Sequence, residues 1–177
     1  SRFGPNSKWG LFPSLSAGWK ISGESFMENI DWLSLMKIRA SWGKSGNDRI
    51  GDYAYMARLG TYNTSWGDGK VSGVAPSNIA NLGLKWEATS SLDLGFDLTA
   101  FNNRFQLNFD YYINTTDDLL FNVTIPYTTG FSSVTDNIGS IRNTGWEVDL
   151  MTYNIQGKFN WSTNLNLSRN RNEVLNM

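Results

Sequence analysis

The stretch "RFQLNFDYYIN" (residues 104–114) alternates apolar and polar side chains almost without exception. A strict period of two is typical of an extended β-strand whose two faces meet different surroundings. The apolar face of such a strand either packs on a protein core or faces lipid. Features elsewhere in the sequence are needed to distinguish these two possibilities. The apolar parity holds Phe105, Leu107, Phe109, Tyr111 and Ile113, and the polar parity holds Arg104, Gln106, Asn108, Asp110, Tyr112 and Asn114.

Five further segments show the same alternation, which predicts an all-β chain of about six strands. In none of the six segments does the apolar parity carry Asp, Glu, Lys or Arg. A Lys or Arg that faces the middle of a bilayer costs roughly 2–4 kcal/mol, so the uncharged parity suits lipid, although it suits a dry protein core as well. The five segments are residues 9–21, 36–42, 91–100, 145–152 and 159–168. The charged side chains of the opposite parity are Lys20, Lys37, Arg39, Asp93, Asp97, Arg104, Asp110, Glu147 and Asp149.

The connections between these segments alternate in length. Residues 101–103 and 153–158 form short joints, and Asn102 and Asn103 tolerate the positive φ that a tight hairpin needs. Residues 43–90 and 114–144 form long joints rich in Gly, Ser, Thr, Asn and Asp. Outer-membrane barrels place short turns at one end and long loops at the other, so the asymmetry favours lipid as the partner of the apolar face.

The remaining joint, residues 22–35, predicts a short helix. Phe26, Ile30 and Leu33 lie at helical spacing behind Ser22, which suits the N-cap position. This joint would lie at the same end of the sheet as the two short turns.

The first segment offers a length check. Trp9 and Trp19 share the apolar parity ten positions apart. At about 3.3 Å per residue and a tilt near 40°, they would span about 25 Å, the height of the apolar band of a membrane barrel. The estimate requires an unbroken strand through Pro13, which cannot donate a ladder hydrogen bond.

Composition excludes several functions. The chain of 177 residues contains no Cys and no His, so disulfides, thiolate catalysis and the commonest general base are absent. Its net charge of −1, without a long basic run, argues against nucleic acid as a partner. No run of about 18 apolar residues predicts a transmembrane helix. A first residue other than Met and an abrupt end lead us to expect a piece of a longer chain.

Several spaced motifs, in order, resemble the barrel of the SusC/RagA family of TonB-dependent outer-membrane receptors of Bacteroidetes. The resemblance covers nearly all of the chain and is weakest in residues 53–79, a loop where family members differ. The motifs are "SRFGPNSKWGLFPSLSAGWKIS" (1–22), "LSLMKIRASWGKSGN" (33–47), "LGLKWEATSSLDLGFDLTAFNNRFQLNFDYYINTTDDLL" (82–120), "NIGSIRNTGWEVDL" (137–150) and "FNWSTNLNLSRNRNEV" (159–174).

The resemblance implies a partial receptor β-barrel over residues 1–177, an antiparallel up-and-down segment of a plugged barrel of about 22 strands. The plug domain and the remaining strands would be absent from this sequence. Family members reside in the outer membrane and import glycans or oligopeptides with a SusD-like surface lipoprotein. TonB acts on the plug of the parent chain rather than on this segment. The implied function is transport without a cofactor and without chemistry on the cargo.

Six aromatic side chains in the two long joints are candidates for contact with the ligand or the lipoprotein, because aromatic rings offer a large contact area at small entropic cost. Packing within the loops is the simpler alternative. The candidates are Tyr53, Tyr55, Tyr62, Trp66, Tyr127 and Phe131.

Three readings of the chain compete with a receptor wall. Asp117–Asp118, "DNIGS" at Asp136 and "WGDGK" at Trp66 offer oxygen ligands for calcium, but without EF-hand spacing, so solvated loop acids are the expectation. Glu147 and Asp149 share one face, as in a carboxylate hydrolase, although charged lumen walls are usual in barrels. The alternative of another class is a soluble ligand-binding β-barrel or β-sandwich, in which the apolar parity would line a dry interior.

Overall fold

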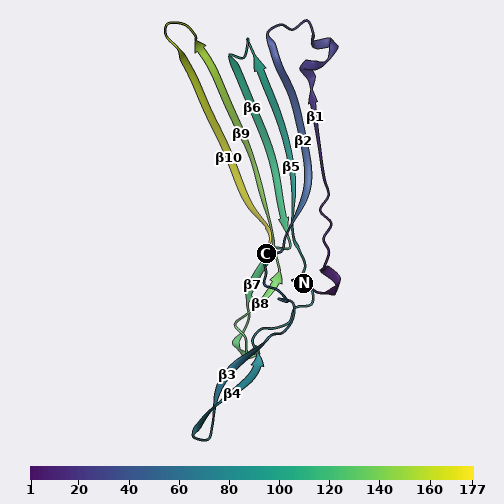
Figure 1. Ribbon diagram of the computed structural model, residues 1–177, viewed down its shortest axis with the longest axis vertical. Helices are drawn as coiled ribbons and strands as arrows, with labels where there is room; N and C mark the ends of the chain where they lie inside the picture. The colour runs from purple at the N-terminus through teal and green to yellow at the C-terminus, as the bar shows by residue number, and fades with distance from the viewer.

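The computed structural model describes residues 1–177 as one long antiparallel sheet with two small hairpins at one end (Figure 1). The sheet has six strands in the order β1-β2-β5-β6-β9-β10, which confirms the all-β prediction. These strands are β1 (Ser14–Lys20), β2 (Leu33–Asn47), β5 (Glu87–Ala100), β6 (Phe105–Asp117), β9 (Ser140–Ile155) and β10 (Trp161–Asn176). The hairpins are β3 (Leu59–Trp66) with β4 (Gly69–Pro76), and β7 (Leu120–Thr124) with β8 (Ser133–Asn137).

The strand register keeps the two faces separate across the whole sheet. Cross-strand partners share a face, and each pairing joins apolar to apolar or polar to polar positions through the middle of the sheet. One central apolar row consists of Trp19, Ile38, Phe96, Phe109, Val148 and Leu167. The adjoining polar row, one residue along, consists of Gly18, Arg39, Gly95, Asp110, Glu147 and Ser168. We refer to these as the apolar face and the charged face.

No protein layer covers the apolar face. Only 6 of the 177 residues are buried, and Leu94 and Leu165 on this face are each 44% exposed. A soluble barrel or sandwich would bring Leu94, Leu107 and Leu165 into a common dry interior. The chain instead forms an open, single-layered sheet. Its edge strands, β1 and β10, have no partner strand on their outer sides (Figure 1).

The short and long connections lie at opposite ends of the sheet, as the loop lengths predict (Figure 1). The β5–β6 turn places Phe101, Asn102 and Asn103 all at positive φ, between 54° and 66°. The two asparagines confirm the hairpin chemistry expected of them. Phe101 was not expected there, and its ring stacks on Trp32 with centroids 5.5 Å apart.

The expected strand at residues 9–21 is wrong at its start. The strand β1 begins only at Ser14, because Pro13 has no N–H to continue the ladder. The carbonyl of Pro13 still accepts a bond from the amide of Lys44 at 2.9 Å. Trp9 lies outside the strand and is 93% exposed. The span estimated from Trp9 to Trp19 therefore does not measure the sheet.

The expected helix in residues 22–35 is also wrong. Two single-turn 3₁₀ helices, η2 (Ile21–Gly23) and η3 (Ser25–Met27), occupy its first half, and β2 begins at Leu33. The hydroxyl of Ser22 caps nothing and is buried without a hydrogen-bond partner. The joint is too short for a helix because β2 takes up its last residues. No helix in the chain has the length and hydropathy to cross a membrane.

The strands extend further toward the long-loop end than the alternation predicts. There, the apolar-face positions become polar beyond Trp42, Leu92 and Ile113, which are aligned across β2, β5 and β6. On β9 and β10 the change comes lower, where Trp146 is followed by Thr144 and Leu167 by Arg169, two and four residues lower in register.

A small core at the long-loop end fixes the N-terminal segment. The ring of Trp86 lies 4.9 Å from that of Phe3 and 5.4 Å from that of Phe12, measured between centroids. Its indole N–H donates to the carbonyl of Ser7 at 3.0 Å. Phe3 and Leu84 are almost completely buried. This cluster positions the chain that leads into β1, although that stretch forms no ladder.

Candidate functional site

Hollows on the charged face indicate that this is the concave side of the sheet. Three hollows along the sheet are lined mostly by charged-face residues of β1, β2, β5, β6, β9 and β10. A sheet that closes into a barrel encloses its concave side. The curvature therefore directs the charged face to the interior and the apolar face to the exterior, which the alternation of residues could not decide.

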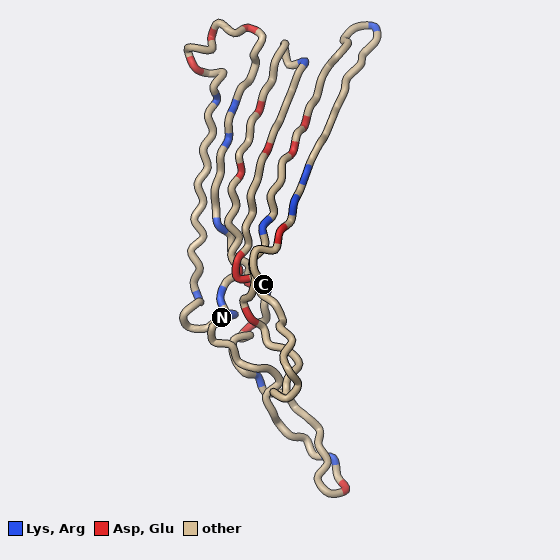
Figure 2. Tube along the Cα trace, turned by 180° about the vertical axis from the view of Figure 1, so that it is seen from behind, with Lys and Arg blue, Asp and Glu red and all other residues tan.

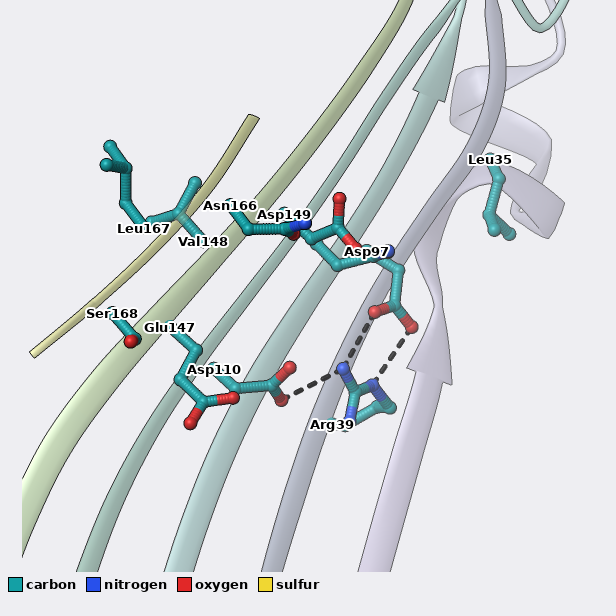
Figure 3. A pocket seen from close by; sticks show the side chains of 11 residues that line it. Leu35, Arg39, Asp97, Asp110, Glu147, Val148, Asp149, Asn166, Leu167 and Ser168 are labelled. Atoms are coloured by element: carbon teal, nitrogen blue, oxygen red, sulfur yellow. Dashed lines mark hydrogen bonds and ion pairs between the residues drawn. The ribbon is translucent and has the colours of Figure 1, made fainter. Parts of the chain in front are cut away.

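Arg39 is the centre of the charged face. Its Nε and Nη2 atoms donate to the two carboxylate oxygens of Asp97 at 2.9 and 2.8 Å, in a bidentate pair. Its Nη2 atom also lies 3.0 Å from Oδ1 of Asp110. Figure 3 shows both carboxylates directed at the guanidinium from neighbouring strands. One cation thus joins β2, β5 and β6 through the planar fork that only Arg offers.

Acidic and amide side chains continue from this centre across β9 and β10. Glu147 is the cross-strand partner of Asp110, and Asp149 is the partner of Asn108. Together with Asn166 and Ser168 they line the largest hollow, while the side chains of Val148 and Leu167 are directed away (Figure 3). The hollow can offer hydrogen-bond acceptors and negative charge to a polar surface inside the barrel.

The two carboxylates of the hydrolase alternative, Glu147 and Asp149, do lie on one face as their spacing predicts. They stand on an open wall among other acids and amides rather than in an enclosed cleft. Two of the acids proposed for calcium have other partners. Asp118 pairs with Lys85 at 2.8 Å, and Asp136 accepts from Asn81 at 2.9 Å. No group of three or more His, Cys, Asp or Glu side chains is placed to hold a metal ion.

A network of amide side chains ties the β7–β8 hairpin to the start of β5. The side chain of Asn137 accepts from the amide of Lys85 at 2.8 Å, and it donates to the carbonyls of Lys85 and Asp118 at 2.9 and 2.8 Å. Glu87 accepts from the amide of Leu120 at 3.1 Å. Sequence reasoning missed this scaffold, since an Asn within a polar loop carries no signal of its partner.

The six aromatic candidates are distributed over several segments of the long-loop end. Tyr62 and Trp66 lie on β3, and Tyr127 lies in the single 3₁₀ turn η4 (Tyr127–Thr129). Phe131 precedes β8, while Tyr53 and Tyr55 precede β3. Trp66 and Tyr127 are the most open, with 83% and 81% of their surface exposed. None of the six belongs to the ring pairs of the chain, which involve Phe3, Phe12, Trp32, Trp86 and Phe101.

Comparison with known proteins agrees with this architecture. Residues 1–174 match the model of the family described as "TonB dependent receptor-like, beta-barrel". The chain belongs to this family. It is of the SusC/RagA type, as the resemblance of its motifs implied, and its relatives are named as receptors and transporters rather than as enzymes.

Individual receptors and solved structures match nearly the whole length of this chain. The TonB-dependent receptor P39 of Formosa agariphila is 46% identical over the whole chain, and the TonB-dependent receptor SusC of Bacteroides thetaiotaomicron is 39% identical over 98% of it. Among solved structures, the RagAB peptide importer in its closed-closed state matches with a TM-score of 0.87 at 34% identity, over 100% of this chain and 19% of that one. The chain spans 17% and 18% of the length of the two receptors.

Proposed function

We propose that this chain forms a section of the wall of an outer-membrane importer that depends on TonB. The observation that carries the proposal is the direction of curvature. The hollows open on the charged face, so closing the barrel turns the exposed apolar face, which carries no charge through the middle of the sheet, outward. An outward apolar face without a protein layer suits acyl chains. The charged face then borders the interior through which cargo passes.

The test is the orientation of the two faces in a bilayer. A nitroxide label on Leu107 and one on Gln106, placed singly in the full-length receptor, should report different surroundings. Molecular oxygen partitions into lipid, so it should broaden the signal at position 107 more than at position 106. A water-soluble nickel chelate should show the opposite preference. Equal accessibility at the two positions would overturn the proposal.

The remaining parts of the importer lie in the parent chain under this proposal. Six strands cannot enclose a lumen of transporter size, so we expect a plug domain and further strands elsewhere in that chain. TonB would act through the plug and not through this section. A partial barrel would explain why the chain spans less than a fifth of its relatives.

The cargo class we propose is oligopeptides or glycans, delivered with a SusD-like surface lipoprotein. RagAB is described as a peptide importer, and SusC is a relative of the same type. The long-loop end is the side that would face the lipoprotein, because both hairpins project there (Figure 1). Replacing β3 and β4 by a four-residue turn should weaken co-purification of the lipoprotein and leave the barrel folded. Unchanged co-purification would count against this arrangement.

The exposed aromatics of the long-loop end are our candidates for contact with cargo or lipoprotein. Trp66 and Tyr127 are the sharpest to test, since their exposure means that truncation costs the fold little. Trp66→Ala and Tyr127→Ala should each reduce uptake or lipoprotein binding several-fold and leave thermal stability unchanged. Leu82→Ala, at an exposed apolar position of the same end, is the matched control. Activity equal to that of the control would favour simple loop packing.

A further inference from the structure

The extended strands place arginines on the apolar face just beyond its boundary at the long-loop end. Arg169 and Arg171 follow Leu167 on β10, at the apolar parity, and their cross-strand partners are Trp146 and Thr144. Arg142 on β9 has the same parity and is the partner of Glu173. Figure 2 shows basic residues gathered on these two neighbouring strands. We call Arg142, Arg169 and Arg171 the arginine cluster.

The three arginines of the cluster are neighbours on one face, and basic residues outnumber acidic ones around them. Cross-strand neighbours on one face are about 5 Å apart and diagonal neighbours about 7–8 Å, so Arg171 has Arg142 as a diagonal neighbour. None of the ion pairs within the chain involves these guanidiniums. Arg142 donates only to the hydroxyl of Thr115, at 3.3 Å. The other charges at this level of the face are Lys44, Asp117 and Glu173, so basic charge exceeds acidic charge.

The position of the arginine cluster along the strands indicates that its partner is a lipid headgroup. It begins at the first apolar-face residue beyond Leu167, where the hydrocarbon of a bilayer gives way to headgroups. Trp146 lies beside Arg169 at this boundary, and tryptophan is typical of the headgroup level. A neighbouring strand on the free edge of β10 would pair through its backbone and leave these side chains facing outward.

We infer that the arginine cluster binds the phosphate of a lipid headgroup in the leaflet at the long-loop end. Guanidinium forks bind phosphate oxygens through charge-assisted hydrogen bonds, and the acyl chains of the same lipid would cover the apolar residues below, Leu165 and Leu167. The inference rests on the proposed orientation of the apolar face toward lipid. It adds a specific lipid contact that fixes the height and rotation of this part of the barrel.

The experiment titrates the full-length receptor in a neutral detergent with phosphatidic acid and counts bound lipids by native mass spectrometry. Diacylglycerol, which has the same tails without the phosphate, and inorganic phosphate alone are the comparators. We expect tight binding of phosphatidic acid only, weakened by salt. The variant R169Q/R171Q should lose at least about tenfold in affinity, because charge-assisted bonds are roughly twice as strong as neutral ones.

The matched control is K70Q/K158Q, which removes two positive charges from the β3–β4 hairpin and from the short turn before β10. It should bind phosphatidic acid like the unmodified receptor. Equal binding by R169Q/R171Q would overturn the inference. Equal binding of diacylglycerol would show that the receptor contacts only the acyl tails. Equal binding of inorganic phosphate would show an anion site that does not need a lipid. Either result would also overturn the inference. The nitroxide contrast at positions 106 and 107 tests orientation separately, so failure of the two proposals can be distinguished.

Discussion

Arg39 on β2 and Gly95 on β5 are cross-strand partners, and the guanidinium of Arg39 occupies the space that a side chain at position 95 would fill. A Cβ on Gly95 would lie 2.6 Å from Cζ of Arg39 and 2.7 Å from Oδ1 of Asp110. The missing side chain thus lets the arginine lie across β5 and reach the carboxylate on β6. The glycine is part of the ion-pair network although it carries no charge.

Replacing this glycine by alanine should disconnect Arg39 from Asp110. We expect G95A to lower the free energy of unfolding by about 1 kcal/mol, since the added methyl group crowds the guanidinium and one partly exposed ion pair is lost. The measurement is urea unfolding of the receptor in lipid vesicles. G18A is the control in the same row, because a Cβ there would meet its nearest atom at an ordinary 3.4 Å. Equal losses for G18A and G95A would contradict the account.

Removing the guanidinium should leave a surplus of negative charge on the charged face. R39M leaves Asp97 and Asp110 without their cation, and Asp110 is the cross-strand partner of Glu147. We therefore expect the free energy of unfolding to fall by about 1–2 kcal/mol. R39K should recover only part of it, because an ammonium cannot form the bidentate pair. Adding D97N to R39M should restore stability if repulsion is the cause. No recovery in that double variant would point to lost packing instead.

A charge placed on the apolar face should prevent assembly into the membrane. Phe109 belongs to the central apolar row, and its neighbour Asn108 faces the opposite side. A lysine at the middle of the lipid face costs roughly 2–4 kcal/mol. F109K should therefore reduce the folded fraction in lipid vesicles, which gel-shift of the unheated barrel can measure. N108K should assemble normally, and impaired assembly of N108K to the same extent would rule out the assignment of faces.

Loss of the Asn137 side chain should release the β7–β8 hairpin without unfolding the sheet. Its three hydrogen bonds connect the hairpin to Lys85 and Asp118. In N137A we expect faster amide hydrogen exchange in residues 119–138, while β5 and β6 stay protected. N63A, which removes a single hydrogen bond within the β3–β4 hairpin, is the comparison. Unchanged exchange in residues 119–138 would show that other contacts hold the hairpin.

The success of the sequence predictions varied with the surroundings of each segment. All six strands of the large sheet were found, because one face of each meets apolar surroundings and that contrast creates the period of two. The strands of the two hairpins, β3, β4, β7 and β8, were not predicted. The additional residues of β9 and β10 were missed because both faces are polar at the long-loop end. The same omission concealed Arg169 and Arg171, which follow Leu167 on β10.

The candidate site was predictable only in part. The charged parity correctly placed Arg39, Asp97, Asp110, Glu147 and Asp149 on one face. Their pairing could not be predicted, since Arg39 meets Asp97 from 58 residues away. The contacts of Asn137 with Lys85 likewise join segments 52 residues apart. For the six loop aromatics, contact with cargo or lipoprotein remains a prediction.

The sequence by itself determined which side chains share a face and at which end of the sheet each connection lies, because alternation along a strand is a local property of extended backbone. Only the tertiary structure decided the register between strands, the stagger of the apolar boundary and the side toward which the sheet curves. Those features depend on contacts between residues distant in the chain, such as Arg39 lying across Gly95. The direction of curvature, and not the alternation, assigns the charged face to the interior of the barrel.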